Sequence, residues 1–233
     1  MKPNRLSIAL GVVLTLSANI ALANIDLKQT ATELTTLLRS ARSVTVNKVT
    51  IDDPSKFVLA DFVVKTKSNY KDAAGKPFDD SDEMLNHLMD AIVFVIGNAK
   101  EGRYKDKWNS GDYAGKFLPA RFAREAGLKF EQLTQGKATI RLTTSDRLLV
   151  NKQNKSQPWE NLVIEQKFMA SSWPKNRIYD KYTKEGFQLL LPEYYNAGCL
   201  GCHGGEQGKK IHASPIAGEL GDFGGAISVF IRR

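Results

Sequence analysis

Two cysteines and a histidine lie within five residues near the C-terminal end of the 233-residue chain, as Cys199-Leu200-Gly201-Cys202-His203. They are the only two cysteines in the sequence. Two thiols three positions apart can each add to one vinyl group of a porphyrin, and the adjacent imidazole can then bind the iron. The spacing therefore predicts one covalently attached haem c, with thioethers from Cys199 and Cys202 and with His203 as the proximal iron ligand.

Three other uses of a Cys-x-x-Cys pair agree less well with this sequence. A thioredoxin-like redox motif usually opens a helix after a strand near the start of a domain, whereas this motif runs into Gly204-Gly205, a poor helix start. A structural zinc site needs further cysteine or histidine ligands, and no second cysteine pair exists. A disulfide across two intervening residues would close a very short loop and constrain little.

The first 23 residues have the pattern of a secretory signal peptide. Lys2 and Arg5 give a positive start, residues 6–16 are apolar, and Ala21-Leu22-Ala23 offers small residues at the cleavage positions. An uncleaved membrane anchor is the alternative, although polar residues interrupt the end of the apolar run. Because c-type haem is attached after export, the leader and the haem motif support each other. They predict a periplasmic protein with no membrane span once the leader is removed.

Composition places residues 24–233 in one domain with a real core, since 42% of the sequence is hydrophobic. The net charge is +8, from 33 Lys and Arg against 25 Asp and Glu. Such an excess favours acidic partners, but the basic residues are scattered and no nucleic-acid-binding motif accompanies them. The sequence therefore predicts an acidic redox or signalling protein as the partner, and no nucleic acid.

Apolar periodicity predicts a mixed α+β chain. Four segments have helical spacing of apolar residues, and Ser81 is the expected N-cap of the second. Three segments have strand character. Residues 57–70 mix helical and strand signals and are left open, and residues 102–115 are predicted to form a loop. The predicted helices are 25–46, 81–99, 118–133 and 159–169, and the predicted strands are 138–143, 187–192 and 226–231.

Five segments, taken in order, resemble the Tll0287-like family of exported c-type haem proteins, long catalogued as a domain of unknown function. They are Ser40–Val44, Phe117–Ala123, Gln157–Glu160, Pro192–Gly204 and Gly224–Val229. The resemblance covers most of residues 24–233 and is most specific from Pro158 onward. It implies a PAS-like antiparallel sheet flanked by helices, an N-terminal helical segment and one covalent haem near the C-terminal strands. Periodicity alone gives only a mixture of helices and strands.

The sixth iron ligand is not fixed by the sequence. His87 is the leading distal candidate and lies between Met84 and Met89 on a predicted helix, where an ordinary surface histidine is equally consistent with the pattern. The two methionines cannot both share its face, so they are expected to fill the core. His212, Met169 and an open or water-bound site are the other possibilities.

Aromatic residues near the motif are candidates for packing against the porphyrin. Tyr194 and Tyr195 precede it directly, and Phe223 and Trp173 are weaker candidates. Aromatic side chains at the end of a core strand would give the same pattern, so both interpretations stay open.

Three classes of function are compatible with a single haem. A one-electron carrier requires two firm axial ligands, whereas a haem-based redox or gas sensor requires a weakly held sixth site and a separate partner. A peroxidase would need a distal acid–base residue beside open iron, and His87 with Glu83 or Asp90 is no convincing arrangement. Relatives include isolated periplasmic proteins and input domains of membrane sensors. Since the sequence ends at Arg233, directly after the last predicted strand, no output domain is expected and electron transfer is preferred over sensing. No enzymatic activity is predicted, because the distal acid–base arrangement is not convincing.

Overall fold

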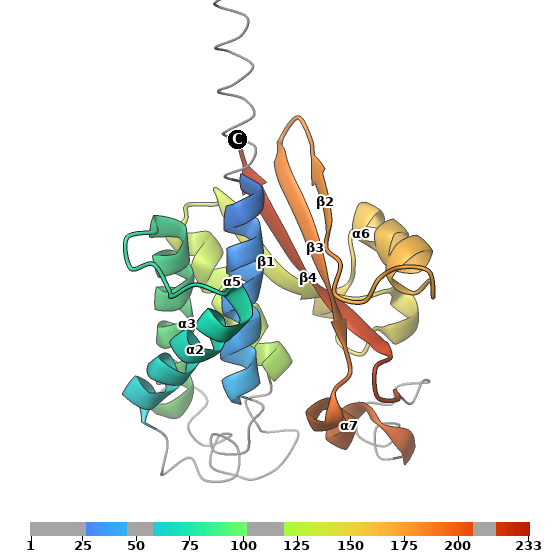
Figure 1. Ribbon diagram of the computed structural model, residues 1–233, viewed down its shortest axis with the longest axis horizontal. Helices are drawn as coiled ribbons and strands as arrows, with labels where there is room; N and C mark the ends of the chain where they lie inside the picture. Colours follow the sequence, from blue (N-terminus) through green and yellow to red (C-terminus); the bar gives the residue numbers. More distant parts are fainter. Residues whose placement is uncertain (1–26, 46–57, 102–118, 207–217) are drawn as a thin grey trace, which may run out of the picture.

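Four strands form one antiparallel sheet at the centre of the structure, in the order β1–β4–β3–β2 (Figure 1). The computed structural model describes residues 27–45, 58–101, 119–206 and 218–233. The strands are β1 (Ala138–Thr143), β2 (Tyr179–Tyr182), β3 (Gly186–Tyr194) and β4 (Phe223–Arg232). The strand that comes last along the chain therefore lies inside the sheet, between β1 and β3.

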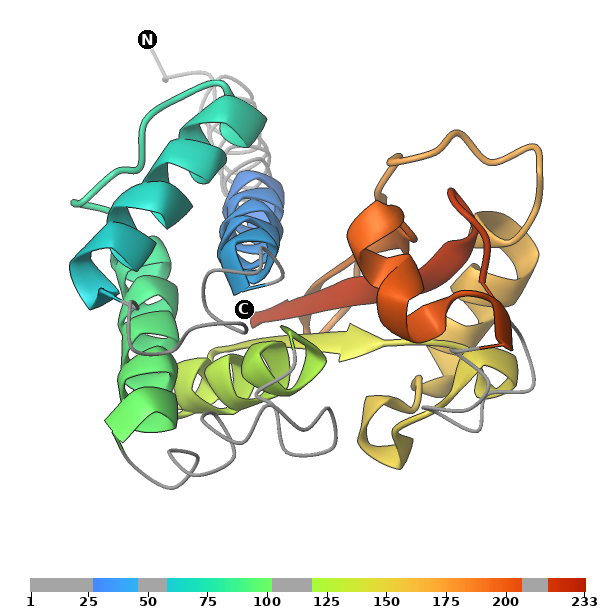
Figure 2. The same ribbon diagram turned by 90° about the horizontal axis from the view of Figure 1, so that it is seen from below.

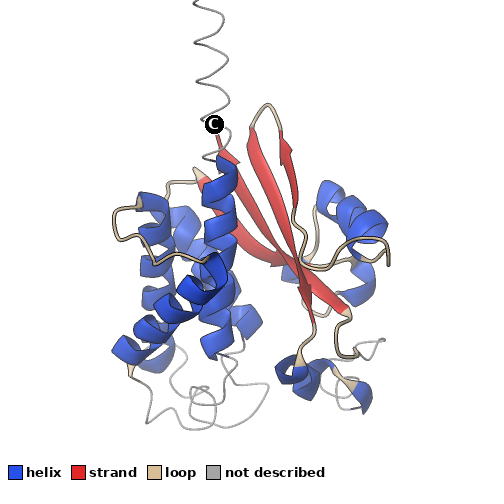
Figure 3. Ribbon diagram, in the orientation of Figure 1, coloured by secondary structure: helices blue, strands red, loops and turns tan. Residues whose placement is uncertain are grey.

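Helices cover both faces of this sheet (Figures 1 and 3). One face carries the N-terminal helix, residues 27–45, together with α2, α3 and α5, and the other carries α6 and a π-helical turn. A short helix, α7, lies beyond one end of the sheet, as the view from below also shows (Figure 2). The bounds are α2 Leu59–Ala74, α3 Glu83–Glu101, α5 Pro119–Leu133, α6 Pro158–Val163, the π turn Ile164–Phe168, and α7 Ala197–His203.

Strand β3 supplies side chains to a separate core on each face, because successive residues of a strand point to opposite sides. Phe187, Leu189 and Leu191 belong to the main core beneath the large helical layer. Leu190 belongs to a second, smaller core with residues of the α6 layer and with Phe223. The long apolar run of β3 is therefore explained by burial on both faces.

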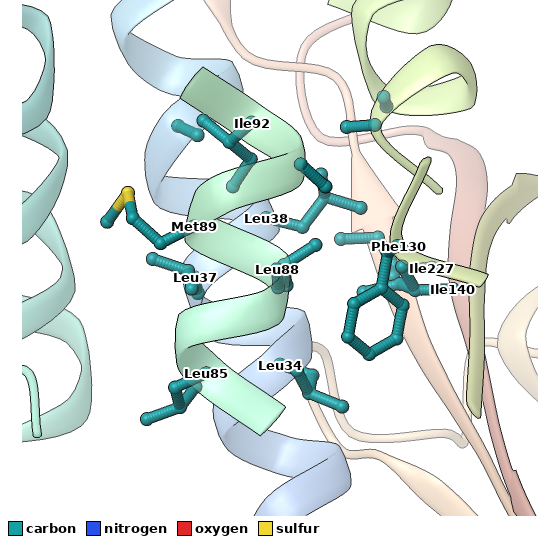
Figure 4. Close-up of a cluster of buried hydrophobic side chains, with 14 of the residues drawn as sticks. Leu34, Leu37, Leu38, Leu85, Leu88, Met89, Ile92, Phe130, Ile140 and Ile227 are labelled. Carbon is teal, nitrogen blue, oxygen red and sulfur yellow. The ribbon is translucent and has the colours of Figure 1, made fainter. Parts of the chain in front are cut away.

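The main core joins the N-terminal helix to α3 and to the sheet (Figure 4). The apolar residues of the N-terminal helix recur at spacings of three and four and most are fully buried, which confirms the helix predicted over residues 25–46 for its described part, residues 27–45. Met89 is buried in this core and Met84 packs against it, as expected for core-filling methionines. The labelled core residues are Leu34, Leu37, Leu38, Leu85, Leu88, Met89, Ile92, Phe130, Ile140 and Ile227.

Three local expectations need correction or completion. The N-cap of α3 is Asp82 and not Ser81, because an Asp82 carboxylate oxygen accepts a hydrogen bond from the Leu85 amide at 3.0 Å. The open segment 57–70 belongs to α2, which buries Phe62, Thr66 and Tyr70 on one face. Strand β2 was not predicted, since its sequence Tyr-Asp-Lys-Tyr gives no clear alternation and it lies at the edge of the sheet.

The other predicted helices and strands are confirmed, with shifts of a few residues at their ends. The predicted signal peptide over residues 1–23 and the predicted loop over 102–115 lie outside the described residues. Within the ranges that the structure describes, no helix is long and apolar enough to cross a membrane.

Tyr70 gives the main core a pH-dependent contact. Its hydroxyl donates to Glu33 Oε2 at 3.2 Å, and burial, followed by the charge of Glu33, raises its pKa above the usual value of 10.0. Because the pKa of Tyr70 is higher in the folded than in the unfolded protein, the neutral phenol stabilises the folded state fully below pH 10. This stabilisation is lost as the pH rises toward the folded-state pKa of Tyr70.

We therefore expect the Tyr70→Phe variant to have a flatter stability profile than the wild type above pH 10. At neutral pH the variant should lose about 1 kcal/mol with the hydrogen bond. Urea unfolding at pH 8 and pH 10.8 measures both effects, with Tyr179→Phe as the control tyrosine. Parallel profiles for wild type and Tyr70→Phe would contradict the expectation.

Candidate haem attachment site

The predicted attachment motif lies on one short helix. Helix α7 runs from Ala197 to His203, and so contains both cysteines and the histidine. Asn196 caps it, because its Oδ1 accepts from the Cys199 amide at 3.2 Å. The sequence analysis predicted no helix here. Gly204 ends this helix in an extended conformation, and Gly205, which follows it, has a φ of +53°.

Helical geometry places the three attachment positions on one side of α7. At about 100° per residue, positions 199, 202 and 203 fall within an arc of roughly 100°. Cys199 is a half-buried free thiol that donates to Asn196 Oδ1 at 3.3 Å. Two cysteine positions and a histidine position on one side of a helix suit the two vinyl groups and the iron of a single porphyrin, so the residue types present fit a c-type haem.

His203 is held by a stacked aromatic ring and by its own backbone. The imidazole lies parallel to the ring of Tyr195, with 5.2 Å between centroids and 18° between planes. The carbonyl oxygen of His203 accepts from the Gly218 amide at 2.8 Å. The stack occupies a face of the imidazole ring. The two ring nitrogens lie at the edge of the ring, so the stack leaves them available to bind iron.

The end of the sheet positions α7. The Tyr195 amide donates to the Asp222 carbonyl at 2.9 Å, and the Gly221 amide donates to the Tyr195 carbonyl at 2.8 Å. These bonds join the exit of β3 to the entry of β4. The register of the β3–β4 pair shifts between Glu193 and Tyr194, and this irregularity directs the chain out of the sheet toward α7.

Two arginines of the N-terminal helix form ion pairs with Glu193, near the end of β3. Arg39 Nε donates to Glu193 Oε1 at 2.6 Å, and Arg42 Nη1 donates to Glu193 Oε2 at 2.7 Å. Arg39 also donates to the Pro192 carbonyl at 3.0 Å. These ion pairs and this hydrogen bond connect the N-terminal helix to the end of the sheet that carries α7. Arg42 and Glu193 lie in segments of the family resemblance, but their pairing across about 150 residues has no local sequence signal.

The other aromatic candidates belong mainly to the second core. Tyr194 packs edge-on against Phe223, with ring centroids 6.1 Å apart. Trp173 lies against Phe168 at 5.8 Å. Of the four aromatic residues named from the sequence, Tyr195 is the one that the structure brings into contact with His203.

Most of the candidates for the sixth iron ligand lie far from α7 in the structure. His87, Met84 and Met89 lie on α3, and both Figure 1 and Figure 2 place α3 on the opposite side of the molecule from α7. His87 Nε2 lies 3.4 Å from Glu83 Oε1. Met169 packs against the second core, and His212 lies outside the described residues. The structure therefore does not bring His87 to His203.

Comparison with solved structures finds a distant likeness. The crystal structure of the cyanobacterial heme-protein Tll0287 shares 15% sequence identity, covers 64% of this chain and 91% of its own, and aligns with a TM-score of 0.40. At that distance it carries no argument about function. No curated protein matches the chain.

A family model gives the stronger result. The model of the Tll0287-like family matches residues 21–232, which is nearly the whole sequence and includes the N-terminal helix, the sheet and α7. The match agrees with the resemblance of the five segments described above. The chain therefore belongs to the Tll0287-like family.

Proposed function

We propose that this protein is an exported, periplasmic c-type cytochrome with one covalent haem, and that it transfers single electrons. The observation that carries the proposal is the placement of Cys199, Cys202 and His203 on one side of a helix that the sheet holds in position. When bound, the haem supplies an iron that cycles between ferric and ferrous states. Family membership and the secretory pattern of residues 1–23 support the proposal.

The chain's own residues would attach and orient the group. Cys199 and Cys202 would hold the haem through two thioethers, each formed by adding the S–H group of the cysteine across one vinyl double bond, a change that needs no external oxidant. His203 would supply an imidazole nitrogen to the iron, and the Tyr195 ring stacks on that imidazole. We propose that the sheet and its helices form a PAS-like domain, in keeping with the family resemblance and with the antiparallel four-stranded sheet.

A basic edge beside α7 suits an acidic redox partner. Lys175 Nζ donates to the Gly221 carbonyl at 2.9 Å and lies 5.4 Å from the centre of the Tyr194 ring. Lys167 and Arg177 lie over Trp173 at 5.3 and 5.2 Å. Once the leader with Lys2 and Arg5 is removed, 31 Lys and Arg remain against 25 Asp and Glu, a net charge of +6. These cations would steer an acidic protein toward the haem edge, with association rates that fall as salt rises.

One observation favours a second candidate function, a haem-based redox or gas sensor that acts through a separate partner. Three of the five side-chain candidates for the sixth ligand lie on α3, away from α7. An open or weakly held sixth position is what a gas sensor requires. We propose no enzymatic activity, because the acid–base pair considered for peroxidase chemistry, His87 with Glu83, lies on that same distant helix.

The visible spectrum of protein made with a cytochrome-maturation system separates these candidates. We expect a low-spin ferrous spectrum that carbon monoxide leaves unchanged, because an electron carrier keeps both axial ligands. A spectrum that shifts on addition of carbon monoxide would replace the carrier proposal with the sensor. The His87→Ala variant adds a direct comparison, since loss of the low-spin spectrum in that variant would assign His87 as the distal ligand against the placement of α3.

A further inference from the structure

Tyr195 lies in a slot that fixes the plane of its ring. A Cβ atom built on Gly218 would lie 2.4 Å from the ring, and one built on Gly224 would lie 2.5 Å from it. Both distances are well below van der Waals contact, so only glycine permits the ring to occupy this position. Neither glycine has a positive φ, and the requirement is therefore one of space, not of backbone conformation.

One short segment of backbone, residues 218–222, connects the slot to both Tyr195 and His203. Gly218 donates to the His203 carbonyl, and Gly221 donates to the Tyr195 carbonyl, both at 2.8 Å. The turn over residues 218–222 thus holds the main chains of the stacking partners as well as one wall of the slot. A rotation of the Tyr195 ring would have to displace this turn or the start of β4.

The stack places Tyr195 against the one imidazole of the predicted attachment motif. The planes of the two rings differ by 18°, so the tyrosine ring covers a face of the imidazole and opposes its tilting. The other aromatic side chain next to it, Tyr194, packs on Phe223 instead.

We propose that Tyr195 is a positioning residue that sets the plane of the His203 imidazole at the iron, with Gly218 and Gly224 as the walls that hold it. This inference rests on the proposed haem function. It adds a second determinant of the iron's electronic state to the identity of the axial ligands, because the orientation of an axial imidazole controls how unpaired spin is distributed over the porphyrin.

The test is the NMR spectrum of the ferric holoprotein, with cyanide added where the sixth position accepts it. The shifts of the four haem methyl groups report the orientation of the axial imidazole plane. We expect Tyr195→Phe to keep the wild-type pattern, because it keeps the ring, and Tyr195→Leu to change the order or the spread of the four resonances. Tyr194→Leu is the matched control and should keep the wild-type order, since Tyr194 packs on Phe223 and not on His203.

An unchanged methyl pattern in Tyr195→Leu would overturn the inference while leaving the haem proposal intact. Wild-type protein without covalent haem would overturn the haem proposal itself, and the inference with it. If Tyr195→Leu does not fold, the wild type still decides the matter in its diamagnetic ferrous state, with carbon monoxide added if the sixth site is open. Cross-relaxation between ring protons of Tyr195 and His203 supports the stack, and its absence overturns it.

Discussion

Replacing both cysteines, as Cys199→Ser with Cys202→Ser, is expected to abolish covalent haem completely. The two thiols are the only cysteines of the chain, so no other side chain can form a thioether. Wild-type protein from cells with a cytochrome-maturation system should show the mass of the polypeptide plus one haem after denaturation. The double variant should show the mass of the polypeptide alone. Mass spectrometry of the denatured proteins measures the difference directly.

Asn196→Ala is the matched control for this experiment. It keeps both thiols and removes only the side chain that caps α7 and contacts Cys199. Loss of the cap should cost about 1 kcal/mol of stability and leave the haem attached. Covalent haem in the double cysteine variant, or bare polypeptide from the wild type, would contradict the proposed attachment chemistry.

The second large effect concerns the buried carboxylate of Glu160, which is 1% exposed. Its Oε2 accepts from the Gln157 amide at 2.7 Å, from the Thr143 hydroxyl at 3.1 Å and from the guanidinium of Arg141. These bonds join α6 to β1. Removing the carboxylate leaves the Arg141 cation, the Gln157 amide and the buried Thr143 hydroxyl without this acceptor.

We expect Glu160→Ala to lower the free energy of unfolding by about 3 kcal/mol, toward the low end for a broken buried pair because Arg141 is partly exposed. For a domain of this size, that corresponds to a fall of roughly 6–12 °C in Tm. Glu165→Ala is the matched control, since Glu165 pairs with a largely exposed Arg147 at 3.1 Å and should contribute less than about 1 kcal/mol. Equal losses in the two variants would contradict the structural role assigned to Glu160. Thermal unfolding by circular dichroism measures both.

The sequence predicted the elements whose signal is local. The N-terminal helix, α3 and α5 have regular apolar spacing, and β3 and β4 are apolar enough to be recognised as strands. The α2 segment was ambiguous because valines at 58, 63 and 64 favour strands, whereas the burial of Phe62, Thr66 and Tyr70 on one face decides for a helix. Local preference was overruled there by tertiary packing.

In the candidate haem site too, the features with a local sequence signal were predicted and the others were not. Cys199, Cys202 and His203 were identified from their types and spacing alone. Helix α7 was missed because it has seven residues, two of them glycines, and depends on a cap that only the folded chain reveals. The contact of Tyr195 with Gly218 and Gly224 was also missed, because neither a stack nor a steric slot between residues this far apart has a periodic signature.

The position of β4 imposes an order of events on the newly made chain. Synthesis delivers β1, β3 and α7 before β4, yet β4 is the strand that pairs with both β1 and β3. Until residues 223–232 arrive, one edge of β3 is unpaired and the backbone that precedes α7 is not yet anchored to the β4 entry. The sheet therefore closes last, at the strand pair from which the chain enters and leaves the region of α7. The same closing strand brings Gly224 against Tyr195, so the slot around the tyrosine ring is completed only by the last strand of the chain.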